Sequence, residues 1–160
     1  MIHVSILCVG KLKEKFYLEA VEEYTRRLAP FCRLTVTQLS ETRLPDRPSE
    51  AQIAQALRQE GQEILARRPR GAALIPLCVE GEQLTSPALA WRMEQWAVQG
   101  GSAICFVIGG SYGLDEAVKA EGVFRLSMSR MTFPHHLARV MLLEQIYRAF
   151  QIQAGTKYHK

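Results

Sequence analysis

The chain has no long hydrophobic run, since none approaches the roughly 20 apolar residues that a membrane-spanning helix needs. Residues 1–15 do not have the pattern of a signal peptide, because their lysines follow the apolar residues and no small-residue cleavage site comes after them. Internal repeats and low-complexity segments are also missing. We therefore expect a soluble protein that does not act at a membrane.

The sequence is poor in cysteine, and none of its four cysteines forms a CxxC pair. Cys8, Cys32, Cys78 and Cys105 lie in apolar, strand-like runs, which predicts buried, reduced thiols and a cytoplasmic location. The histidines, at positions 3, 135, 136 and 159, make no metal-ligand spacing with these cysteines. We expect no zinc site or other metal site.

Neither sign of charge is in large excess. The formal net charge is +4 at pH 7 and the isoelectric point is about 9.0. This balance favours an anionic partner, but many proteins that share it bind no nucleic acid, so charge alone leaves RNA binding open. A chain of 160 residues with 48% hydrophobic residues matches one globular domain, which we expect to span residues 1–160.

Strand-like and helix-like segments alternate along the chain. The hydrophobic patterns predict strands at residues 2–9, 32–39, 72–79, 102–110 and 123–127, and helices at residues 14–28, 49–66, 87–97, 115–121 and 134–153. Such alternation is typical of an α/β fold with a mostly parallel sheet flanked by helices.

Two strand-to-helix loops in the second half of the chain suggest a small-ligand pocket. The strand at 102–110 ends in Gly109 and Gly110, and Gly113 follows; these glycines can adopt positive φ and let a ligand approach the backbone. A second loop, residues 129–133, leads to Pro134 at the start of a helix. Open α/β sheets bind ligands at such strand ends, although glycines in turns are more often structural.

Two familiar phosphate-binding motifs do not fit the glycine-rich segment 109–119. Its sequence GGSYGLDEAVK lacks the GKS or GKT ending of a P-loop. Ile108 stands where the first glycine of GxGxxG would be, and no acidic residue ends a strand about 20 residues later. Both observations argue against a nucleotide-hydrolysing site and against nicotinamide or flavin cofactors.

The helix predicted at 134–153 is apolar around most of its circumference, so it must be buried on several sides. A second subunit related by a two-fold axis would cover it, and ordinary packing within one chain is the alternative. The tail that follows closes with Tyr158, His159 and Lys160, which can stack on a base, exchange a proton and hold a phosphate. A frayed terminus is the other interpretation.

Several basic groups could contact RNA, although each is also typical of a solvated surface. Arg43 and Arg47 lie in an irregular loop at 41–50, where they could touch phosphate. Lys11, Lys13 and Lys15 form a second group, and the run at 67–70 forms a third.

A set of short motifs in a fixed order resembles one known family. The motifs are VG at 9–10, EYTRR at 23–27, IGG at 108–110, GL at 113–114, FPH at 133–135, YRA at 147–149 and YH at 158–159. Over its whole length the chain resembles the bacterial RlmH-type large-subunit rRNA pseudouridine N3-methyltransferases, minimal members of the SPOUT methyltransferase superfamily. The resemblance implies S-adenosylmethionine-dependent methylation of N3 of a pseudouridine in 23S rRNA, on the assembled 70S ribosome.

The resemblance further implies a homodimer and a C-terminal trefoil knot. The hydrophobic pattern does not show a knot, and alone it predicts a plain open sheet. The implied cofactor-binding residues are Leu77, Gly109, Gly110, Ser129, Arg130, Met131, Thr132, Phe133 and Pro134. The residues implied around the target base are His135, Arg139, Tyr158 and His159, and Lys160 is expected to touch RNA.

The sequence departs from the family pattern at two places. Residues 78–80, Cys-Val-Glu, replace a more usual DIPG-like turn after Leu77, and Arg130 adds a charge to the cofactor loop. Either His159 or His135 could accept the proton that the target nitrogen loses, and so could solvent. A SPOUT enzyme for another RNA position and a non-catalytic ribosome-binding module are the alternative functions.

Overall fold

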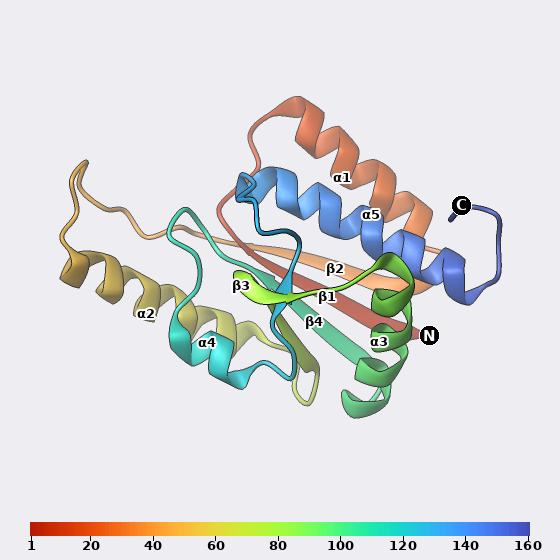
Figure 1. Ribbon diagram of the computed structural model, residues 1–160. Coiled ribbons are helices and arrows are strands. Elements are labelled where there is room, and N and C mark those ends of the chain that lie inside the picture. The colour runs from red at the N-terminus through yellow and green to blue at the C-terminus, as the bar shows by residue number, and fades with distance from the viewer.

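The computed structural model describes all 160 residues as alternating strands and helices (Figure 1). In chain order the elements are β1 (Ile2–Val9), α1 (Lys15–Leu28), β2 (Cys32–Leu39), α2 (Glu50–Arg67), β3 (Ala73–Gln83), α3 (Ser86–Gln99), β4 (Ala103–Ile108), α4 (Glu116–Glu121), β5 (Leu126–Ser127) and α5 (His135–Gln153). All ten predicted elements are therefore present, with ends that differ from the predictions by a few residues.

The five strands form one sheet in the order β2-β1-β4-β3-β5, and every neighbouring pair is parallel. The expectation of a mostly parallel sheet is confirmed. Because parallel strands all point the same way, their carboxyl ends lie along one edge of the sheet. The loops after β1, β2, β3 and β4 therefore start from this edge.

Helices cover both faces of the sheet. Successive side chains of a strand point to opposite faces, and those of the central strands are apolar in both directions, so both faces must be buried. Val4 and Ile6 of β1 belong to the larger core cluster, together with side chains of α1, α3 and α5. Leu7 and Val9 face the other way and join Ile64 of α2 and Val118 of α4 in a smaller cluster. Figure 1 shows the same division, with α1 and α5 above the sheet and α2 and α4 below it.

Two strand predictions in this region were wrong in length. β3 continues to Gln83 instead of ending at residue 79, so residues 78–80 belong to a strand and do not form a turn. β5 has only two residues. The segment 123–127 runs alongside β3, with the Val123 amide bonded to the Leu74 carbonyl oxygen, but the register is irregular because Leu126 is paired with both Leu77 and Glu82. Gly81 allows this close passage, since a Cβ there would lie 2.6 Å from the Arg125 carbonyl oxygen.

Helix α5 packs against both α1 and α3 and lies over β4. Leu142, Leu143 and Ile146 are fully buried, so packing within one chain accounts for the inner side of this helix. Leu137, Val140 and Met141 are only half-buried, which leaves an apolar stripe along the outer side. None of the helices has the length and hydropathy needed to cross a membrane, and the knot stays a prediction.

Candidate functional site

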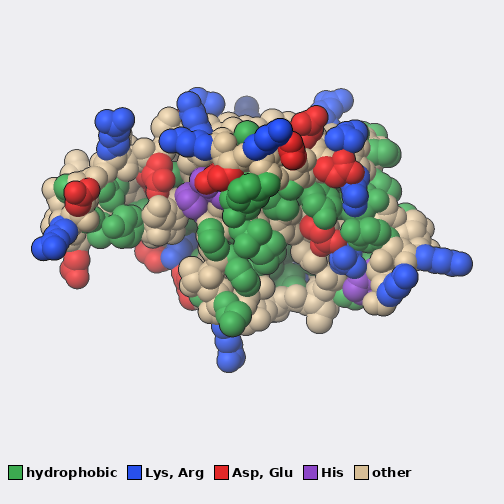
Figure 2. Space-filling view, turned by 90° about the horizontal axis from the view of Figure 1, so that it is seen from above, with side chains coloured by type: hydrophobic (Ala, Val, Ile, Leu, Met, Phe, Trp, Pro, Cys, Tyr) green, Lys and Arg blue, Asp and Glu red, His purple; other side chains and the backbone are tan.

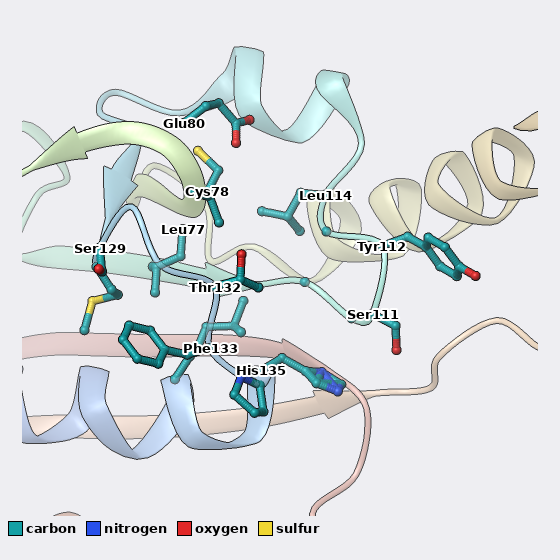
Figure 3. A pocket seen from close by; sticks show the side chains of 18 of the residues that line it. Leu77, Cys78, Glu80, Ser111, Tyr112, Leu114, Ser129, Thr132, Phe133 and His135 are labelled. Carbon is teal, nitrogen blue, oxygen red and sulfur yellow. The ribbon is translucent and has the colours of Figure 1, made fainter.

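A cavity of about 700 Å³ lies at the carboxyl edge of the sheet, over the ends of β3 and β4 (Figure 3). Its walls come from the last part of β3, the glycine loop after β4, helix α4, and the loop between β5 and α5. The lining residues are Leu77, Cys78, Val79, Glu80, Ile108, Gly109, Gly110, Ser111, Tyr112, Gly113, Leu114, Lys119, Met128, Ser129, Met131, Thr132, Phe133, Pro134, His135 and Ala138.

Both loops that the sequence suggested for a ligand line this one cavity. Of the nine expected cofactor residues, Arg130 alone is not in the wall. Figure 3 shows Leu77 and Phe133 on one side of the cavity and Leu114 on the other. The cavity thus combines apolar side chains with backbone amides and carbonyls of two loops, which is typical of a site for a small organic molecule.

The charged residues in the wall form a pair. Lys119 of α4 donates hydrogen bonds to Glu80 of β3 and to Glu116 one turn away. The hydrogen bond from Lys119 lowers the pKa of the Glu80 carboxyl, which is therefore ionised at neutral pH. The cavity wall thus presents one positive and one negative group to a ligand.

Gly113 has the positive φ that the sequence predicted, of 82°, whereas Gly109 and Gly110 do not. Those two glycines are required by the packing of the loop. A Cβ on Gly109 would lie 2.4 Å from the Gly113 carbonyl oxygen, and one on Gly110 would lie 2.6 Å from Oε1 of Glu41. The absence of side chains lets the loop close on itself and on Glu41, whose Oε1 accepts a hydrogen bond from the Ser111 amide at 2.9 Å.

The second loop is held by the hydroxyl groups of two serines. Ser127 is buried, and its Oγ lies 2.9 Å from the Val79 carbonyl oxygen and 3.0 Å from that of Ser129. The Ser129 Oγ accepts a hydrogen bond from the Met131 amide at 3.0 Å. The cavity side of this loop is therefore positioned before any ligand arrives.

His135 begins α5 and faces the cavity from below in Figure 3. Its ring stacks on that of His136, with centroids 4.3 Å apart. Burial, followed by the nearby His136, lowers the pKa of His135, so its ring is neutral at pH 7. Nδ1 is buried without a hydrogen-bond partner, which leaves Nε2 as the nitrogen that a substrate can reach.

Arg139, expected beside the target base, lies one turn further along α5 and does not line the cavity. It is 1% exposed. Its guanidinium donates hydrogen bonds to the Gly10 carbonyl oxygen at 3.1 Å and to Oε1 of Gln38 at 3.0 Å. Gln38 Oε1 also accepts from the Leu12 amide at 2.8 Å. In this chain Arg139 positions the loop after β1.

The tail is not frayed, because its aromatic residue packs on the last turns of α5. The Tyr158 hydroxyl donates to Oε1 of Glu144 at 3.1 Å, and its ring meets Tyr147 edge to face. Arg148 pairs with Glu144 and reaches Nδ1 of His159 at 3.2 Å. Tyr158 and His159 thus dock on the second half of α5, whereas His135 lies at its start.

The residues expected to contact RNA are dispersed. Lys160 is exposed at the end of the tail. Arg47 is exposed in the loop before α2, and Arg43 in the same loop lines a second, separate cavity. No group of three or more His, Cys, Asp or Glu side chains is arranged to hold a metal ion.

Four residues at the cavity were not expected from the sequence. Lys119, Tyr112 and Leu114 line it, and Glu41 binds its glycine loop from outside the wall. Lys119 stands in a short helix with no motif of its own, and nothing in the sequence pairs it with Glu80. Tyr112 and Leu114 flank Gly113, which has a positive φ. The GL motif at 113–114 was the sequence signal that could have pointed to this part of the wall. Glu41 follows β2, and only the folded sheet brings its carboxylate to the glycine loop.

Comparisons with known proteins agree with one another. The sequence model of the family described as "Predicted SPOUT methyltransferase" matches residues 2–159. The chain is 46% identical to ribosomal RNA large subunit methyltransferase H of Bifidobacterium animalis subsp. lactis, and 43% identical to the protein of that name from Leuconostoc mesenteroides; each match spans 158 residues and 99% of both chains.

A solved structure shares the fold at low sequence identity. A methyltransferase of Legionella pneumophila, determined with the bound cofactor SAM, superposes with a TM-score of 0.51 at 14% identity. The match covers 95% of this chain and 66% of that one. At this identity the likeness supports the fold alone.

We predict that Cys78 is the one cysteine that reacts with a thiol reagent in the folded protein. It is half-buried in the cavity wall, whereas the other three cysteines are buried. Burial raises the pKa of the Cys78 thiol and raises that of Cys105 to about 12. The reaction should therefore accelerate at alkaline pH.

Titration with Ellman's reagent, in buffer and in denaturant, measures this reactivity. The C78A variant should lose the native signal and keep the other three thiols after unfolding. Two or more fast thiols in the native protein would contradict the prediction.

Proposed function

The chain belongs to the SPOUT methyltransferases, in the family of ribosomal RNA large subunit methyltransferase H, and we propose that it methylates N3 of a pseudouridine in 23S rRNA. The methyl donor is S-adenosylmethionine and the substrate is the assembled 70S ribosome, which places the enzyme in the cytoplasm. The observation that carries this proposal is the single cavity formed by both motif-bearing loops, IGG with GL and the segment before FPH.

The cavity fits the proposed cofactor in size and in the chemistry of its wall. Leu77, Leu114 and Phe133 offer apolar surface to an adenine ring, and the backbone groups of the two loops offer donors and acceptors for its polar edge. Lys119 and Glu80 provide opposite charges for the amino acid end. When bound, S-adenosylmethionine supplies an electrophilic methyl group on a sulfonium sulfur.

The residues of the site orient the target base against the methyl group and accept one proton from it. The imide nitrogen of the target base must lose its proton to become a good nucleophile, and Nε2 of neutral His135 is placed to accept it. Orientation of the base against the methyl group contributes most of the acceleration, because the reaction is a direct displacement. The preformed loop around Ser129 serves this orientation.

We expect the rate of methyl transfer to stay constant as pH falls from 8 through the ordinary pKa of histidine, about 6.5, and to decline only below it. The sign follows from burial, which disfavours the protonated ring of His135 and keeps the basic form present at lower pH. Replacing His135 with Gln should slow single-turnover methylation about 100-fold and remove the acidic decline.

Single-turnover rates between pH 5 and pH 9 measure both effects, and cofactor affinity measured separately is the control. His136→Gln is the matched variant, since that ring stacks on His135 but does not line the cofactor cavity. An unchanged rate and pH profile in His135→Gln would end the proton-acceptor assignment.

The site is proposed to be completed in a homodimer. The tail folds back along the second half of α5, where the Tyr158 hydroxyl reaches Glu144, nine residues or about 13 Å along the helix axis from His135. No residue of the tail lines the cavity of its own chain. The outer stripe of Leu137, Val140 and Met141 supplies apolar surface for a second subunit. Hydrophobic side chains gather at the centre of the face seen from above in Figure 2. A two-fold axis at this face brings the partner's tail to the cavity.

Complementation between two defective chains tests this arrangement. Thr132→Arg fills the cavity from an exposed position, and a chain that ends at residue 157 lacks the tail. Each homodimer should be inactive, whereas purified heterodimers should regain about half of the wild-type rate, because one complete site remains. Inactive heterodimers would show that each tail serves its own chain.

The reaction itself is tested by incubating the protein with labelled S-adenosylmethionine and 70S ribosomes that lack the modification. Digestion of the RNA and mass spectrometry of the nucleosides should identify labelled N3-methylpseudouridine. Label in a different nucleoside would instead indicate a SPOUT enzyme for another position. Absence of transfer from bound cofactor to ribosomes, subunits or free RNA would overturn the proposal.

A further inference from the structure

A second cavity lies beside the cofactor cavity on the same edge of the sheet. Its volume is about 490 Å³, and no hydrophobic residue lines it. The wall consists of Gly10, Lys11, Lys13, Glu14, Ser40, Glu41, Arg43, His135 and His136. These residues follow β1 and β2 or begin α5, whereas the cofactor cavity lies over β4, β3 and β5.

The sheet order explains why the two cavities adjoin. β1 and β4 are neighbours, so the loops after them leave the edge next to each other. His135 lines both cavities. Glu41 lines the second one and binds the Ser111 amide in the glycine loop of the first. A group that enters the second cavity therefore lies next to whatever reacts in the first.

The cations and the carboxylates of the second cavity differ in their contacts with the rest of the protein. Lys11, Lys13 and Arg43 are exposed, and none makes a hydrogen bond or ion pair through its side chain. The two carboxylates of the cavity are in contact with other groups: Glu41 accepts a hydrogen bond from the Ser111 amide, and Glu14 lies 3.6 Å from Nδ1 of His136. The three cations outnumber the two carboxylates and have no side-chain partner within the protein.

The backbone at this cavity is also fixed. Gly10 has a φ of 102°, and its carbonyl oxygen accepts a hydrogen bond from the Arg139 guanidinium. The Gly10 amide donates to the Leu39 carbonyl oxygen at 2.7 Å, which ties the end of β1 to the end of β2. Lys11 and Lys13 thus extend from a rigid base, as a defined binding site requires.

We propose that this second cavity binds a backbone phosphate of the RNA next to the target nucleotide, with Lys11, Lys13 and Arg43 as its ligands. Ammonium and guanidinium groups are the usual phosphate ligands in nucleic-acid complexes, and such contacts fix register without reading sequence. The phosphate sets the distance between the RNA backbone and the methyl donor, and His135 is the wall between the two. This inference rests on the proposed function, because it assumes an RNA substrate.

Replacing both Lys11 and Lys13 with Ala should weaken binding to 70S ribosomes at least tenfold and reduce the slope of log Kd against log salt concentration by about two. Cofactor affinity, measured by calorimetry, should not change. Arg43→Ala alone should reduce the slope by about one. Lys13→Arg keeps the charge and should therefore keep most of the wild-type affinity.

Lys15→Ala is the matched control. Lys15 lies two residues beyond Lys13, but its ammonium group pairs with Glu19 and does not line the cavity. Its replacement removes the same charge from nearly the same place and should change ribosome affinity less than twofold.

The two proposals fail in different ways. If wild-type protein transfers methyl groups to ribosomal RNA but the Lys11 and Lys13 variant binds as wild type does, the phosphate site is wrong and the function stands. If the variant loses no more affinity per charge than Lys15→Ala, the lysines act only through general charge, and the site is again wrong. If wild-type protein neither binds nor methylates ribosomes, both proposals fall.

Discussion

The parallel pairing of all five strands is the constraint on which the site depends. It brings the loops after β1, β2, β3 and β4 to one edge, so segments more than a hundred residues apart in the sequence meet there. Burial of the sheet between two helical layers makes this geometry rigid, because β1, β2, β3 and β4 each contribute side chains to both cores. The loops can therefore carry different functional groups, while the sheet and its helices hold all of them in fixed positions.

Much of the fold was predictable because each element has a local signature. Hydrophobic runs bounded by glycine or polar residues marked the strands, and the capping box of Ser49 and Gln52 is of the kind that marks a helix start. The length of β3 was not predictable, since Glu80, Gly81 and Glu82 are poor strand formers. They are extended because the segment around Arg125 passes beside them, which is a tertiary contact.

The candidate site was predictable in its loops and less so in its details. Motifs pointed to the residues around Gly109 and Phe133. The positive φ expected of the glycines is found at Gly113 alone, whereas neighbouring atoms of the protein exclude a Cβ at Gly109 and Gly110. The family resemblance implied that Arg139 lies beside the target base, and in the structure its side chain is buried and donates hydrogen bonds to Gly10 and Gln38. The docked position of Tyr158 depends on Glu144, and no pattern of spacing encodes that contact.

The burial of Arg139 also bears on how the protein folds. A buried guanidinium is tolerated only while its acceptors are in place, and here they come from the end of β1 and from β2, whereas the charge itself comes from α5. Packing α5 onto the core before the ends of β1 and β2 are in place would bury the Arg139 charge without its acceptors. The first and last parts of the chain should therefore assemble in one cooperative step, and partly folded forms that lack either part should be scarce.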